Sequence, residues 1–316
     1  MLCSIVIPLY NKANFIEAAL NSVLTQTYQN FEILVIDDGS TDNSASLVAT
    51  CIDPRVHMIR QNNNGVASAR NRGIQEANGE LICFLDADDR YLPVFLETIV
   101  SMAKAFPEID LFATGFKYVN NAYASEATWD YGNTSEYHLV GDFFKRWQAG
   151  LLFCTDSVAV RRTHPALIQP CFPLGESMGE DLDLWFKLAG AADLVFCPAQ
   201  LTVYRTDVTG SLCATNIVRS LLPAFVRLEQ RALRNELLPQ HRIAALRLVT
   251  EARVTMARAA IQGGSVLDAI KMLFNIPRGV WVRRWWVTLV MCLLGSSSLA
   301  KYWENWRHRR KQHCRY

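Results

Sequence analysis

The hydrophobic residues in the first third of the chain form short continuous runs that alternate with stretches of helical spacing. The continuous runs occupy residues 2–9, 31–36, 56–60 and 81–85. The helical spacing covers residues 15–23 and 66–77. Strands that are apolar on both faces are typical of a parallel sheet covered by helices on both sides. The pattern therefore predicts an α/β fold with a mostly parallel sheet flanked by helices.

The rest of the chain has a different pattern. Residues 120–162 are less periodic and rich in aromatic and polar side chains, and we expect them to wrap a substrate or an acceptor. Residues 216–274 return to helical spacing, with many Arg and few strand formers. We therefore expect an α/β domain over residues 1–215, a helical extension over 216–275 and a basic, Trp-rich tail over 276–316.

The tail carries most of the positive charge of the chain. From residue 276 to the end there are nine Lys/Arg and one Glu, whereas the other 275 residues carry 23 Lys/Arg and 29 Asp/Glu. Its apolar core, residues 285–294, is ten residues long, and a membrane-spanning helix needs about 20. With Trp and Arg at both ends, this pattern favours an element lying in the interface of an anionic membrane. The alternative is a helix hairpin packed on the body or on a second subunit, followed by a solvated basic tail.

Composition favours an intracellular protein. Half of the 316 residues are hydrophobic, which is sufficient for a core. The nine cysteines are scattered and form no CxxC or Cys/His cluster, so neither a disulfide framework nor a zinc site is expected. The N-terminus has no basic segment or cleavage site of a secretory signal. We expect a cytoplasmic protein, peripheral on the inner face of the plasma membrane.

Acidic residues stand directly after two of the predicted strands. Asp37 and Asp38 end the second run, and Asp86, Asp88 and Asp89 follow the fourth. In a parallel sheet, neighbouring strand ends bring such groups into one crevice, where ligands bind. Mg²⁺ and Mn²⁺ take oxygen ligands, often one or two carboxylates together with substrate phosphates. Turn and helix-cap chemistry explains either group alone, but the two together favour a site for a metal and a diphosphate.

Five segments in order resemble the family 2 glycosyltransferases, which have the GT-A fold. They are residues 4–11 (SIVIPLYN), 37–42 (DDGSTD), 64–71 (NGVASARN), 86–89 (DADD) and 179–185 (GEDLDLW). The resemblance covers roughly residues 2–211. It implies a Rossmann-like α/β domain, with a C-terminal helical extension outside the resemblance. It also implies transfer of a sugar from a nucleotide donor to an acceptor hydroxyl, with inversion at the anomeric carbon.

The resemblance implies a set of donor-binding residues. Pro8, Tyr10 and Asn11 would contact the nucleotide base, with Asp38 as its polar anchor. Arg70 would lie near the nucleotide or the diphosphate.

The same resemblance implies a metal site. Asp88 would be a metal ligand, and Asp86 would contact the ribose or the metal through water. Asn64 is a further substrate-binding position. The cofactor would be Mn²⁺ or Mg²⁺, acting as a Lewis acid on the departing diphosphate.

The pair Glu180 and Asp181 resembles the base motif of the family. Inversion needs a base on the face opposite the leaving group, and Asp181 is the expected base, with Glu180 as the second choice. On a helix, Trp185 shares a face with Asp181 and could wall the sugar or acceptor site. Residues 204–211 resemble a closing loop, in which Arg205 would meet the diphosphate. Alone, the acidic pair would suit a solvated first helical turn.

We expect a non-processive enzyme that adds a single sugar. Processive synthases of this family carry Gln-x-x-Arg-Trp beside a bundle of spanning helices, whereas here Trp281 takes the place of the Gln before Arg284 and Trp285. By resemblance the donor is a UDP-sugar. The expected acceptor is a glycan or a lipid-linked glycan, as in bacterial surface polysaccharide assembly.

Other classes of protein explain parts of the pattern. A receiver-like regulatory module also binds Mg²⁺ at parallel strand ends, but it leaves Glu180 and Asp181 unexplained. A nucleotidyltransferase shares the metal and nucleotide chemistry, but a glycine-rich basic loop near the N-terminus is missing. An inactive scaffold would not need both acidic motifs. The basic tail has no accompanying nucleic-acid-binding motif, so no nucleic acid partner is expected.

Overall fold

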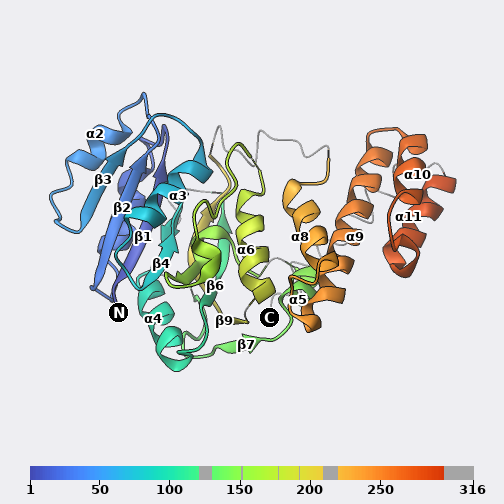
Figure 1. Cartoon of the computed structure of the whole chain (residues 1–316). Helices are drawn as coiled ribbons and strands as arrows, with labels where there is room; N and C mark the ends of the chain where they lie inside the picture. The colour runs from blue at the N-terminus through green and yellow to red at the C-terminus, as the bar shows by residue number, and fades with distance from the viewer. Residues whose placement is uncertain (121–129, 151, 177, 192, 209–219, 295–316) are drawn as a thin grey trace. The chain divides into compact units, whose positions relative to one another are not determined.

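The protein is described here from a computed structural model, shown in Figure 1. The structure describes residues 1–120, 130–150, 152–176, 178–191, 193–208 and 220–294. The chain divides into two compact units. The first comprises Met1–Gly141 and Leu151–Asn216, and the second comprises Asp142–Gly150 and Ile217–Tyr316. Residues 142–150 thus belong with the C-terminal helices, although they lie inside the expected α/β domain.

A nine-stranded mixed sheet forms the centre of the first unit, in the order β3-β2-β1-β4-β8-β6-β9-β5, with β7 also paired to β9. The strands are β1 (Cys3–Leu9), β2 (Phe31–Asp37), β3 (Val56–Arg60), β4 (Leu81–Phe84), β5 (Arg90–Tyr91), β6 (Leu111–Val119), β7 (His138–Val140), β8 (Val158–Arg161) and β9 (Leu194–Arg205). The first four runs of the sequence pair in parallel as predicted. The other half is mixed, because β8 runs antiparallel to both β4 and β6.

Helices flank this sheet, as the sequence pattern predicted (Figure 1). They are α1 (Ile16–Leu24), α2 (Ser44–Ala49), α3 (Val66–Glu76), α4 (Phe95–Ala105) and α6 (Glu180–Ala191), with 3₁₀ turns η2 (Thr155–Ser157) and η3 (Pro165–Leu167). The central strands β1 and β4 are largely apolar because both of their faces are covered. In β1, Ile5, Val6 and Ile7 are all fully buried. The helix α3 approaches β1 so closely that a Cβ added at Gly73 would lie 2.2 Å from Cγ1 of Val6.

The parallel register brings the carboxyl ends of three strands to one edge of the sheet. Leu9 at the end of β1 pairs with Asp37 at the end of β2. On the other side of β1, Val6 pairs with Phe84, the last residue of β4. The acidic residues that follow β2 and β4 therefore leave the sheet at the same edge, which is where ligands bind in folds of this class.

The second unit is helical. Its described elements are α5 (Phe143–Ala149), α8 (Pro223–Leu233), α9 (Pro239–Gln262), α10 (Val266–Phe274), the 3₁₀ turn η4 (Gly279–Trp281) and α11 (Arg283–Leu293). The long helix α9 packs against the four other helices. Its side chains Val254, Ala257 and Ile261 share one hydrophobic cluster with Trp285 and Met291 of α11.

This cluster extends across the boundary that was expected at residue 276. The first part of the expected tail is therefore a packed helix, in which the Trp285 indole donates a hydrogen bond of 2.8 Å from Nε1 to the carbonyl oxygen of Leu273. The basic residues of 301–315 lie outside the described residues. Among the helices that the structure describes, none is both long enough and apolar enough to cross a bilayer.

Candidate active site

The carboxylate of Asp38 organises the loop that leads into α3. Asp38 is buried at the end of β2, and its Oδ1 accepts hydrogen bonds from Nε2 of Gln61 (2.7 Å) and from the backbone N–H of Asn64 (2.9 Å). Its Oδ2 accepts one from the N–H of Gly65 (2.8 Å). Gly65 has a φ of +87°, a conformation that favours glycine. In this structure Asp38 and Asn64 therefore shape the loop, and their donor-binding roles stay predictions.

The end of β1 is joined to the loop after β2. Oδ1 of Asn11 accepts a hydrogen bond from the N–H of Thr41 (2.8 Å), and the N–H of Asn11 donates to Oγ of Ser40 (3.1 Å). The ring of Tyr10 is 45% exposed beside this junction, and Pro8 is half-buried. The end of β1 thus presents an accessible aromatic ring, as a nucleotide base would require.

Asp37 has a structural role. It is fully buried, and its Oδ1 accepts a hydrogen bond from the N–H of Ser40 (3.0 Å). Its Oδ2 lies 3.2 Å from Nε of Arg60. This is the turn chemistry that was the alternative explanation for the first acidic group.

The guanidinium of Arg70 connects the two acidic motifs. Arg70 projects from α3 and is only 4% exposed. One terminal nitrogen donates to Oδ1 of Asp86 and the other to Oε1 of Glu180, both at 2.8 Å. Burial alone would lower the pKa of Arg70, but the charges of Asp86 and Glu180 raise it well above its ordinary value. Arg70 therefore joins the acidic group after β4 to the acidic pair that begins α6.

Three carboxylates form a compact cluster beside Arg70. The ligand atoms of Asp86, Asp89 and Asp156 lie within 4.8 Å of one another. The N–H of Asp86 donates to Oδ1 of Asp156 (2.7 Å), and the N–H of Arg205 donates to Oδ1 of Asp89 (2.7 Å). The loop after β4, the turn η2 and the end of β9 thus meet at this point.

The chemistry of this cluster fits a hard divalent cation. Burial, together with the charge of Asp156, raises the pKa of Asp89 well above its ordinary value. Burial and the charge of Asp86 raise the pKa of Asp156 to about 7. Buried acids that oppose one another's ionisation are a setting in which a cation can replace the protons. An all-oxygen donor set suits Mg²⁺ or Mn²⁺.

The cluster differs from the expected pair of metal ligands. Asp86 belongs to it, but the carboxylate of Asp88 forms an ion pair with Nζ of Lys12. Lys12 follows the end of β1, so this ion pair links the two predicted parts of the donor site.

Glu180 and Asp181 begin helix α6, directly after Gly179, whose φ is +76°. Oδ2 of Asp181 accepts a hydrogen bond from Oγ1 of Thr155 (2.9 Å), the residue before Asp156. Glu180 is buried against Arg70, and burial raises its pKa. Asp181 is the more exposed acid of the pair and the one that is not engaged by Arg70. The structure therefore brings Asp181 into the same constellation as Asp86 and Asp156.

Trp185 does not line an accessible site, contrary to the expectation. Its side chain is 1% exposed and packs edge-to-face against Phe84 (5.9 Å between ring centroids), Phe153 (5.9 Å) and Phe172 (6.3 Å). Trp185 lies one helical turn after Asp181 as predicted, but these three aromatic rings fill the space around it. Trp185 supports α6 from beneath.

Arg205 is directed towards a neighbouring acid and an aromatic ring. Its guanidinium lies 3.2 Å from Oδ1 of Asp207 and 4.6 Å from the ring centroid of Phe15. Tyr204 precedes it at the end of β9, whereas Ser211 of the expected closing loop lies outside the described residues. A contact of Arg205 with a diphosphate stays a prediction.

The family model for "Glycosyl transferase family 2" matches residues 4–164, which is half of the chain. The chain belongs to this family. Membership decides against the receiver-like and nucleotidyltransferase alternatives.

Curated glycosyltransferases match about a third of the chain. An uncharacterized glycosyltransferase of Rickettsia conorii, RC0461, is 51% identical over 89 residues, which are 28% of this chain and 15% of that protein. YibD of Escherichia coli is 42% identical over 102 residues, 32% of this chain and 30% of that protein. GlyG of Streptococcus pneumoniae is 42% identical over 101 residues, 31% of this chain and 34% of that protein. The matches thus span about a third or less of these relatives.

Solved structures resemble a larger part of the chain. The crystal structure of Staphylococcus aureus TarS 1–349 in complex with UDP-GlcNAc has a TM-score of 0.69 and 15% identity, and covers 96% of this chain and 92% of that chain. At this identity the likeness shows the fold. The α/β sheet with its C-terminal helices is thus the GT-A fold that the sequence motifs implied.

Sequence reasoning missed three residues of this candidate site. Asp156 and Thr155 lie in η2, and Lys12 follows the end of β1. A signal for Asp156 was present, because it is a lone carboxylate inside the mostly apolar stretch 151–160. Because buried acids rarely occur without a partner, Asp156 was a candidate cation ligand in the same way as the acids after β4.

Proposed function

We propose that this chain is an inverting, metal-dependent glycosyltransferase that moves one sugar from a UDP-sugar to a hydroxyl of a glycan or lipid-linked acceptor. The observation that supports it most is the bridge by Arg70, which holds Asp86 and Glu180 at 2.8 Å each. This bridge joins a donor-side acid to Glu180, the residue before the proposed base Asp181, and so supports a single displacement step in which the two sides act together.

The cation would be held by Asp86, Asp89 and Asp156. When bound, Mg²⁺ or Mn²⁺ would offset the charge that grows on the departing diphosphate. Asp88 is a further candidate, provided that it leaves Lys12. The TarS structures in complex with UDP-GlcNAc and with UDP support UDP as the nucleotide, since they share the fold.

Asp181 would act as the base. Thr155 donates to one carboxylate oxygen (2.9 Å) and the N–H of Leu182 donates to the other (2.7 Å), so the orientation of the carboxylate is set before an acceptor arrives. A held carboxylate can take the proton of the acceptor hydroxyl as that oxygen attacks the anomeric carbon. Glu180 is a weaker candidate, because its carboxylate is already engaged by Arg70.

The proposed place of action is the inner face of the plasma membrane, in the assembly of a bacterial surface polysaccharide. The acceptor would be lipid-linked, and the basic, Trp-rich C-terminal segment would bring the enzyme to an anionic membrane. The support for this part is the excess of nine Lys/Arg over one Glu from residue 276 to the end.

The base assignment is tested with Asp181→Asn. We expect the variant to release UDP from UDP-sugars at least about 100-fold more slowly than the parent protein, because general-base catalysis contributes roughly 10²–10⁴ in rate. Calorimetric titration should give an affinity for UDP in Mn²⁺ equal to that of the parent.

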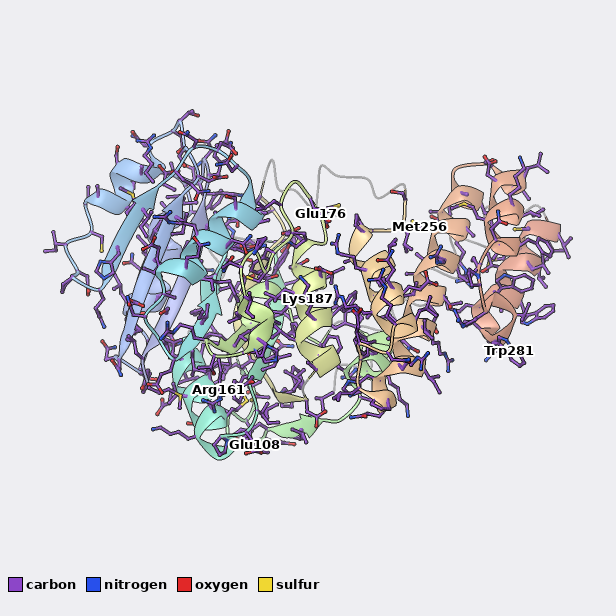
Figure 2. All side chains as sticks on the ribbon, viewed as in Figure 1. Glu108, Arg161, Glu176, Lys187, Met256 and Trp281 are labelled. Atoms are coloured by element: carbon purple, nitrogen blue, oxygen red, sulfur yellow. The ribbon has the colours of Figure 1, made fainter. Side chains whose placement is uncertain are left out.

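The matched control is Glu108→Gln, which changes an exposed carboxylate just after α4 (labelled in Figure 2) and should leave both measurements unchanged. If Asp181→Asn lost UDP binding and turnover together, Asp181 would belong to the donor site and the base would lie elsewhere. Proton NMR of the sugar first released tests inversion, and a retained anomeric configuration would contradict it.

A further inference from the structure

The second unit carries large apolar side chains on its outer surface. They are Leu267 and Phe274 of α10, Val280 and Trp281 of η4, and Trp286, Val290 and Leu293 of α11, followed by Leu294. We call this set the outer apolar face. Trp281, labelled in Figure 2, is 85% exposed. An apolar surface of this kind marks a site of interaction with a partner or a membrane.

In α11 the outer apolar face lies opposite the side chains that form the core of the second unit. In α11, the core face is formed by Trp285, Thr288, Met291 and Cys292, which are buried. Trp286 and Val290 lie on the opposite side of the same helix and are each 52% exposed. Helix α11 is thus apolar on a side that the described residues of the unit leave open.

Ring contacts show that this face is continuous from α10 to α11. The buried indole of Trp285 lies edge-to-face with Phe274 (5.8 Å between centroids) and with Trp286 (4.9 Å). Nε1 of Trp286 donates to the carbonyl oxygen of Val280 (2.9 Å). Phe274, Trp286 and Val280 therefore surround one anchor residue and present one surface.

The exposed charges around this surface are predominantly positive. Lys271, Arg278 and Arg283 are exposed within or beside it, and the exposed acid of the described stretch 266–294 is Asp268. Asp268 accepts a hydrogen bond from Oγ of Ser265 (2.6 Å). Indoles and phenyl rings bordered by cations are typical of a protein surface at the level of anionic lipid headgroups.

We infer that the outer apolar face lies in the interface of an anionic bilayer. Trp281, Trp286 and Phe274 would enter the headgroup region, while Lys271, Arg278 and Arg283 would contact lipid phosphates. A second copy of the chain fits less well, because a two-fold contact through this face would bring its cations together. This inference rests on the membrane location in the proposed function. It attributes membrane binding to the helices α10 and α11 and the turn η4, and does not depend on residues 295–316.

The test is sedimentation of the full chain with sucrose-loaded vesicles, using phosphatidylglycerol–phosphatidylethanolamine vesicles and pure phosphatidylcholine vesicles. We expect binding to the anionic vesicles. In Trp281→Ser/Trp286→Ser the affinity should fall at least about tenfold, because two indoles no longer leave water. The matched control is Ile52→Ser in the first unit, which replaces a side chain that is 97% exposed and should bind as the parent does.

Two further measurements separate the possible failures. UDP binding in Mn²⁺ should be equal in the parent and the double variant, and circular dichroism should show the same helix content. A parent protein that binds anionic vesicles but transfers no sugar would contradict the proposed reaction and support this inference. Equal vesicle binding by the parent and the double variant would overturn the inference, as would a parent that ignores anionic vesicles. If the parent is an oligomer that does not bind vesicles, and the double variant is a monomer, the outer apolar face is a contact between two copies of the chain and the inference is wrong.

Discussion

At the scale of single residues, Arg70 determines how the site is built. The sequence motif placed it near the nucleotide or diphosphate, but both terminal nitrogens already bond to carboxylates of this chain. In this structure Arg70 holds these two acids, and its contact with the nucleotide or diphosphate stays a prediction. A buried cation between two acids is stable only while its partners are present, and the acids depend on it in the same way.

Replacing Arg70 with Met should leave Asp86 and Glu180 without their cation. We expect the free energy of unfolding to fall by about 3 kcal/mol, because breaking a buried ion pair leaves an uncompensated charge. Urea denaturation in EDTA measures it. The control is Arg72→Met on the same helix, where an exposed pair with Glu76 (2.7 Å) should contribute below about 1 kcal/mol. Equal denaturation midpoints for the two variants would show that Arg70 has no such role.

At the scale of elements, the sequence predicted the strands and helices that are local and strongly patterned. The runs at 2–9 and 31–36 became β1 and β2, and the spacing over 66–77 became α3. These predictions were correct because strands buried on both faces must be apolar throughout. The close approach of α3 to β1 could not be predicted, since it depends on the distance between Gly73 and Val6 in the folded protein.

Gly73→Ala should destabilise the contact between α3 and β1. The added Cβ would lie 2.2 Å from Cγ1 of Val6, which is fully buried. Overpacking of this kind costs roughly 1–3 kcal/mol, more than the gain in helix propensity of about 1 kcal/mol. Thermal unfolding should therefore occur at a lower temperature than in the parent. Gly141→Ala is the control, because a Cβ there meets nothing within 4 Å. A Gly73→Ala protein as stable as this control would mean that α3 can move away from β1 without cost.

The mixed half of the sheet explains why Asp156 was missed. It lies in η2, directly before β8, and β8 is inserted antiparallel between β4 and β6. The order of strands in a sheet is set by long-range pairing, which local periodicity does not contain. The acids after β4 lie at the same edge of the sheet as those after β2, as predicted, because β1 and β4 are parallel neighbours. The prediction that Trp185 lines the acceptor site was wrong. Helical spacing places Trp185 and Asp181 on one face of α6, but it does not show whether other side chains cover that face.

At the scale of the whole molecule, the site and the outer apolar face belong to different units. The residues of the site, from Pro8 to Arg205 along the chain, all lie in the first unit. The family match ends at residue 164, before Glu180 and Asp181. The proposed roles of these two acids therefore depend on the sequence motif and on contacts such as that of Thr155 with Asp181. Residues 142–150 join the second unit through packing such as that of Phe144 on His241 (6.0 Å between centroids). This long-range contact could not be predicted from the sequence.

The central claim is that acids at the edge of the sheet bind a cation that holds the departing diphosphate. The most direct measurement is calorimetric titration of UDP into the full chain, once in Mn²⁺ and once in EDTA. The account predicts binding in Mn²⁺ and an affinity at least about tenfold lower in EDTA, because the carboxylates of Asp86, Asp89 and Asp156 would repel the diphosphate without a cation. Equal affinity for UDP in the two buffers would contradict it.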